Sequence, residues 1–158
     1  MFLQQNWRAM ELDSENPVVA LCAAGMAAGG EGLAAADCFT RAWAARADDF
    51  EAAVAAHYVA RVQADAAVKL AWDKRAVWHA EAALVAGDER VRCLLASLYL
   101  NCGDGLLGAG RRDEARKAAT QAEAALAALP DDGYRGFVAA GVARLRARAQ
   151  SESLTAAS

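Results

Sequence analysis

Proline is scarce in this chain, with only Pro17 and Pro130 among 158 residues. Because proline interrupts helices, its scarcity leaves room for long helical segments. The chain also lacks any strand-length alternation of Val, Ile, Thr or Tyr with polar residues, which excludes an ordinary β-sheet domain. Alanine, the strongest helix former, occurs 44 times. We therefore predict an all-α protein of long helices and short turns, built as one domain.

The spacings that mark disulfide and metal sites are missing too. None of the four cysteines forms a C-x-x-C pair, and there are only two histidines. Cys93 and Cys102 are too far apart along one predicted helix to form a bridge, whereas the first helix pair can bring Cys22 and Cys38 together. We expect reduced, buried thiols. No cofactor or metal is expected, because no glycine-rich phosphate loop or metal-ligand motif is present.

No apolar run is long enough for a membrane span or a signal peptide, so we expect a cytoplasmic protein without membrane contact. Charge is unevenly spread: residues 1–89 carry 13 acidic and 7 basic side chains, and residues 90–158 carry 7 acidic and 10 basic. This polarity fits head-to-tail association, an acidic partner or simply an uneven solvated surface. Nucleic-acid binding is not indicated, because Arg144, Arg146 and Arg148 cannot share one helix face.

The chain divides into an amphipathic arm at residues 1–15, a helical domain at 16–149 and a frayed tail at 150–158. The arm is a candidate cap for the domain or a contact that forms a homodimer. Asn16-Pro17 is typical of a helix start, with Asn as N-cap and Pro in the first turn. The apolar residues of the arm are Phe2, Leu3, Trp7 and Met10.

Within the domain, we predict three antiparallel helix pairs and one capping helix. Glycine and aspartate residues mark the turns between them. The predicted pairs are 17–28 with 33–47, 49–62 with 67–86, and 89–108 with 113–129, and the capping helix runs from Asp131 or Asp132 to about Ala149.

The sequence signals for helices and turns are clearest in residues 97–122. Gly103 allows two helices to approach closely, and Gly110 permits the backbone conformation of a helix C-cap. Ala115 is a small contact residue on the returning helix. The spacing indicates one helix, a tight turn and a second helix packed against the first. The residues that define it are Asn101-Cys102-Gly103, Leu106, Gly110 and Glu114-Ala115.

These residues resemble the tetratricopeptide repeat, whose helix pairs stack into a solenoid. A looser match covers residues 18–43, and the spacing of the two matches indicates a period of about 40 residues, longer than the family's usual repeat. Leu106 stands where the family has tyrosine, and Ala119 where it has an aromatic residue. The resemblance implies an α-solenoid whose concave groove, lined by the first helix of each pair, holds a peptide or protein.

Two polar stripes are candidates for that groove. His57 and Arg61 are one helical turn apart, and Ser97, Asn101 and Asp104 follow i, i+4, i+7 spacing on another helix. Family members that bind peptide carboxylates use Lys, Arg and Asn of the groove, and the resemblance puts Asn101 at the matching asparagine position. Ser97 stands where a lysine would help. The favoured hypothesis is a non-catalytic adaptor that binds a protein or peptide partner through these five residues.

Two alternatives remain. In the first, Arg61 pairs with Asp104 or a helix end and His57 satisfies a local hydrogen bond, so that the stripes are structural. In the second, a pocket around His57, Arg61, Asn101 and Asp104 binds a small molecule or is enzymatic. His57 would then act as base, Asp104 would orient it and Arg61 would bind an oxyanion.

Four further side chains of the 67–86 helix receive no functional role. The indole of Trp72 and the imidazole of His79 are predicted to pack against the neighbouring helix pair. Asp73 and Glu81 are eight residues apart, and their carboxylates are predicted to face solvent.

Overall fold

The structure, a computed structural model, describes residues 12–151. Helices make up 81% of these residues, and none of them lies in a strand. The all-α prediction is therefore confirmed. The α-helices are α2 (Pro17–Ala27), α3 (Gly32–Ala45), α4 (Asp49–Arg61), α5 (Ala66–Val85), α6 (Arg92–Gly108), α7 (Arg112–Ala125) and α8 (Gly133–Ser151), with short 3-10 turns η2 (Glu89–Val91) and η3 (Leu126–Ala128).

The predicted helix starts agree closely with the observed caps. Asn16 Oδ1 accepts the amide hydrogens of the second and third residues after it, with Pro17 in the first turn. At α8 the cap is Asp132, whose carboxylate accepts two amide hydrogens. The predicted arm residues Phe2, Leu3, Trp7 and Met10 and the tail from residue 152 lie outside the described residues.

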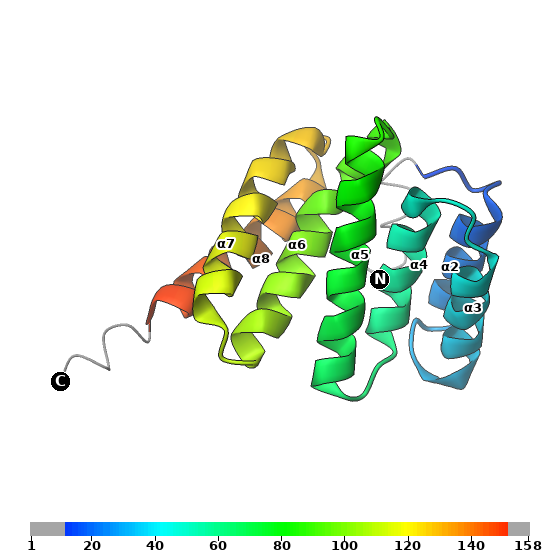
Figure 1. The fold of residues 1–158 in the computed structure, drawn as a ribbon, viewed down its shortest axis with the longest axis horizontal. Helices are drawn as coiled ribbons and strands as arrows, with labels where there is room; N and C mark the ends of the chain where they lie inside the picture. Colours follow the sequence, from blue (N-terminus) through cyan, green and yellow to red (C-terminus); the bar gives the residue numbers. More distant parts are fainter. Residues whose placement is uncertain (1–11, 152–158) are drawn as a thin grey trace.

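Each α-helix packs against the next one in the chain, and α2 also contacts α4 while α6 also contacts α8. The helices follow one another along the longest axis of the molecule, with α2 and α3 at one end and α7 and α8 at the other (Figure 1). Tight turns make this packing possible. Gly110, at φ +77°, ends α6 as predicted.

Helix α4 is buried on almost every side. Ten of its thirteen residues are buried, and five of these are alanines. The helix packs against α2, α3 and α5, so more than one face must be apolar. Because alanine adds little volume, the surrounding helices approach α4 closely while leaving few gaps.

Glycine provides a second means of close approach. A Cβ atom at Gly103 in α6 would lie 2.5 Å from Leu145 Cδ2 of α8 and 3.2 Å from the Cβ of Ala118 in α7. The predicted role of Gly103 in close helix packing is therefore confirmed. Gly25 does the same for α2 and α3, because its Cβ would lie 2.3 Å from the ring of Phe39.

The prediction that Asp73 faces solvent is wrong. Its side chain is 2% exposed, and its Oδ2 lies 2.6 Å from Lys69 Nζ. Because α5 packs against both α4 and α6, this part of its surface is interior. Burial raises the pKa of Asp73, and the hydrogen bond from Lys69 opposes that shift. Glu81 is exposed, as predicted, and accepts a 2.8 Å hydrogen bond from the Tyr99 hydroxyl.

Candidate functional site

Four of the five predicted site residues line one pocket of about 130 Å³. His57 and Arg61 reach it from α4, and Ser97 and Asn101 reach it from α6. Helix α8 supplies another part of the wall. The remaining lining residues are Met26, Tyr58, Leu100, Tyr134, Phe137 and Val138. The pocket therefore combines polar groups from two helices with an apolar and aromatic wall.

His57 is a neutral, hydrogen-bonded imidazole. Asn101 Nδ2 lies 3.4 Å from His57 Nδ1, and an amide nitrogen can only donate, so Nδ1 accepts. Burial lowers the pKa of His57 to about 4, and the cations of Lys69 and Arg61 contribute to the shift. The imidazole is therefore uncharged at neutral pH and offers its other nitrogen as a donor.

Arg61 is the one charged residue among those that line the pocket. Its Nε donates a 3.1 Å hydrogen bond to the carbonyl of Gly30, in the turn between α2 and α3. Within the described part of the chain, its two terminal nitrogens have no hydrogen bond and no ion pair. The guanidinium is thus anchored through one donor and keeps the others for a ligand.

Ser97 and Tyr134 complete the polar side of the pocket. The Ser97 hydroxyl donates a 2.9 Å hydrogen bond to the carbonyl of Leu94, which leaves its oxygen available as an acceptor. Burial raises the pKa of Tyr134, and a hydrogen bond with Ser97 opposes the shift. Phe137, which is 50% exposed, forms part of the apolar wall.

Asp104 does not line this pocket. It is exposed, and its Oδ1 lies 3.2 Å from Arg148 Nη1 of α8. Asp104 therefore neither orients His57, which is paired with Asn101, nor binds Arg61. The helical stripe predicted from the sequence is divided between the pocket and a surface ion pair.

A larger cavity, which sequence reasoning missed, lies where three helical segments begin. It has a volume of about 420 Å³ and lies beside the N-termini of α2, α4 and η2. Arg90 and Glu89 form part of its wall, and both are ion-paired. The full lining is Leu12, Asp13, Asn16, Phe50, Glu89, Arg90, Arg92, Cys93 and Ala128.

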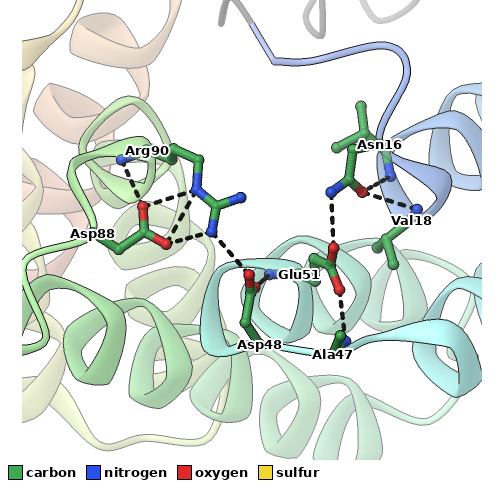
Figure 2. Close-up of polar contacts among 8 residues, drawn as sticks. Asn16, Val18, Ala47, Asp48, Glu51, Asp88 and Arg90 are labelled. Carbon is green, nitrogen blue, oxygen red and sulfur yellow. Dashed lines mark hydrogen bonds and ion pairs between the residues drawn. The ribbon is translucent and has the colours of Figure 1, made fainter.

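A network of polar contacts beside this cavity connects the helix caps, as Figure 2 shows. Glu51, which is only 9% exposed, accepts hydrogen bonds from Asn16 Nδ2 at 2.8 Å and from the backbone N–H of Ala47 at 2.6 Å. Arg90 Nη2 lies 2.6 Å from the carboxylate of Asp88 and 2.9 Å from that of Asp48. Each of these carboxylates is bound by a partner in the same chain. We therefore assign the network a structural role.

Comparisons with protein-family models, curated proteins and solved structures find no significant match. Within residues 12–151, no group of three or more His, Cys, Asp or Glu side chains is arranged to hold a metal ion. In the same residues, no helix is both long enough and apolar enough to cross a membrane.

Proposed function

We propose that this chain is a non-catalytic interaction module that binds a peptide or protein partner at the pocket between α4, α6 and α8. In this proposal the helix pairs stack as in tetratricopeptide repeats, and the pocket belongs to their concave groove. The cytoplasmic location and a homodimer formed through residues 1–15 stay predictions.

One observation carries the proposal. Arg61 keeps unpaired guanidinium donors in a pocket where the nearby imidazole is neutral and no lining residue is acidic. Such a site attracts an anion, and a carboxylate matches the geometry of a guanidinium best. The second N–H of the Asn101 amide can donate to the carboxylate, while the wall formed by Leu100, Phe137 and Val138 can contact an adjacent apolar group.

The size of the pocket favours part of a peptide over a whole metabolite. Small-molecule sites commonly enclose about 300–1,000 Å³, and this pocket is smaller. Catalysis is less favoured for a separate reason. His57, with a pKa of about 4, is a weak base at neutral pH, and Asp104 lies elsewhere.

A library of peptides with free C-terminal carboxylates tests the proposal, with the same peptides amidated as controls. We expect the Arg61→Glu variant to bind the peptides with free carboxylates roughly tenfold or more weakly than the wild-type protein does. In the variant, a charge-assisted contact becomes a repulsion. Lys117→Glu, the same charge reversal on the exposed surface of α7, should bind normally.

Two results would contradict the proposal. Equal binding by a folded Arg61→Glu variant would exclude the pocket as the site. Equal binding of free and amidated peptides would exclude recognition of a terminal carboxylate. Circular dichroism of each variant establishes that the fold is retained.

A further inference from the structure

A cluster of aromatic rings and guanidinium groups lies on α3 and α5, apart from both cavities. Trp43 contacts Trp72 edge-to-face, with ring centroids 5.0 Å apart, and lies 6.0 Å from the ring of His79. The ring of Trp78 lies 4.7 Å from that of His79. We call this cluster the tryptophan–arginine surface, and its members are Trp43, Arg46, Trp72, Arg75, Trp78 and His79.

The two arginines stack on the indoles. The guanidinium carbon of Arg46 lies 3.6 Å from the ring centroid of Trp43. That of Arg75 lies 4.4 Å from the centroid of Trp72 and 5.6 Å from that of Trp43. Such cation–π contacts hold both guanidinium groups in place beside the rings. The predicted packing role of Trp72 is thus confirmed, but the packing also includes two exposed cations.

Stacking uses the face of a guanidinium and leaves the N–H donors at its edge available. Arg75 makes no hydrogen bond or ion pair with any described residue, and Arg46 donates only to the carbonyl of Trp43. Asp49, the carboxylate in contact with the cluster, is engaged by His79 Nδ1 at 2.7 Å. Neither guanidinium of the surface therefore forms an ion pair with the described part of the chain.

The exposure of these rings is unusual for a surface without a partner. Trp78 is 62% exposed, and Trp43 and Trp72 are only half-buried. Tryptophan and arginine are the residues most enriched at the energetic centres of protein interfaces. An exposed indole next to fixed guanidinium groups suits a segment that carries carboxylates beside an apolar side chain.

We propose that the tryptophan–arginine surface docks an acidic segment of a protein partner. Carboxylates of the segment bind the edges of the Arg46 and Arg75 guanidinium groups, and Trp78 covers an apolar side chain. Charge complementarity favours a protein over a nucleic acid. The chain carries a net charge of −3, and two arginines neutralise few phosphates, so the electrostatic contribution to polynucleotide binding is small.

Selection of displayed random twelve-residue peptides on the full-length chain tests this proposal. We expect the selected peptides to be enriched in Asp and Glu next to an apolar residue. Their affinity should fall roughly tenfold or more in Arg46→Glu/Arg75→Glu, because two charge-assisted contacts are reversed. Binding should also shift the tryptophan emission of a Trp7→Phe protein, in which every remaining tryptophan belongs to the surface.

Controls separate this surface from the pocket. Arg41→Glu, on the same helix as Trp43, and Arg61→Glu should both leave binding of the acidic peptides unchanged. If the double variant does not fold, the single variants Arg46→Gln and Arg75→Gln replace it and should each weaken binding. The proposal is overturned if the selected peptides lack acidic enrichment, or if folded Arg46 and Arg75 variants bind them as tightly as wild type. Preferential binding of oligo-dT at this surface would also overturn it.

Discussion

His57 illustrates how much a residue's surroundings decide about its chemistry. An ordinary histidine is partly protonated near pH 6.5, whereas burial and the cations of Lys69 and Arg61 lower the pKa of this one to about 4. The neutral imidazole accepts a hydrogen bond from Asn101 and leaves Arg61 as the charge of the pocket. The attraction for an anion at neutral pH therefore comes from Arg61 and not from the histidine.

We predict that the His57 imidazole titrates near pH 4 in the folded protein. Because the chain has only two histidines, a His79→Gln variant assigns the signal in an NMR titration. The pKa of the folded state is depressed, so protonation opposes folding, and the free energy of unfolding decreases as the pH falls from about 6.5 through 4.

A His57→Gln variant should lose this contribution to acid sensitivity, which urea denaturation at several pH values can measure. A His57 signal that titrates near 6.5 would show that the imidazole is solvated. The neutral pocket described above would then be incorrect.

The sequence predicts most of the site residues, but it does not predict which of them line the pocket and which lie outside it. Helical spacing alone brings His57 and Arg61, and Ser97 and Asn101, to common faces. It cannot show that Asp104 leaves the pocket, because the cation that binds it, Arg148, belongs to another helix 44 residues away.

At the scale of helices, the capping residues do more than end their own helix. Asn16 caps α2 and also donates to Glu51 of α4. Asp48 caps α4 and also binds Arg90, which follows the cap Asp88. Figure 2 shows that the starts of these segments are connected to one another through side chains. We infer that this network fixes the relative positions of α2, α4 and η2.

We predict that Glu51→Ala destabilises the protein by about 2–3 kcal/mol, because two partly buried hydrogen bonds to its charged carboxylate are lost. Glu51→Gln should destabilise it less, by roughly 1–2 kcal/mol, since the amide offers one acceptor but places its own donor against the second N–H. Denaturant midpoints measure both changes.

The comparison variant is Asp65→Ala at the start of α5. Asp65 accepts a capping hydrogen bond from Val68 and makes no side-chain contact with the start of another described helix, so its loss should destabilise the protein by only about 1 kcal/mol. If Glu51→Ala were no more destabilising than Asp65→Ala, the network would not connect the helices energetically.

At the scale of the molecule, Gly103 is the point where α6, α7 and α8 meet. The space that its missing side chain leaves is occupied by Leu145 and Ala118, and Leu145 is fully buried. Helix α8 also lines the candidate pocket through Tyr134 and Phe137. Close packing at Gly103 therefore helps to set one wall of the site.

We predict that Gly103→Ala destabilises the protein by about 1–3 kcal/mol, because the added methyl group overlaps Leu145 and pushes α8 away. Gly136→Ala, in an exposed part of α8 with no atom close to the new methyl group, should instead stabilise it by about 0.5–1 kcal/mol. Thermal and urea unfolding distinguish the two variants. If Gly103→Ala stabilised the protein as Gly136→Ala does, Gly103 would not be a point of close helix contact.

The sequence by itself determined the local structure of this protein. Alanine content, glycine turns and Asn or Asp caps specify where helices form and end, because these signals act within a few residues. Tertiary packing decided which side chains from different helices come into contact, and local sequence signals do not specify these contacts. It buried Asp73 between helices, moved Asp104 to an ion pair with Arg148, and gathered Trp43, Arg46 and Arg75 on one surface. These outcomes depend on which helices become neighbours. Contacts between helices that are distant in the sequence produce no periodic pattern from which they could be predicted.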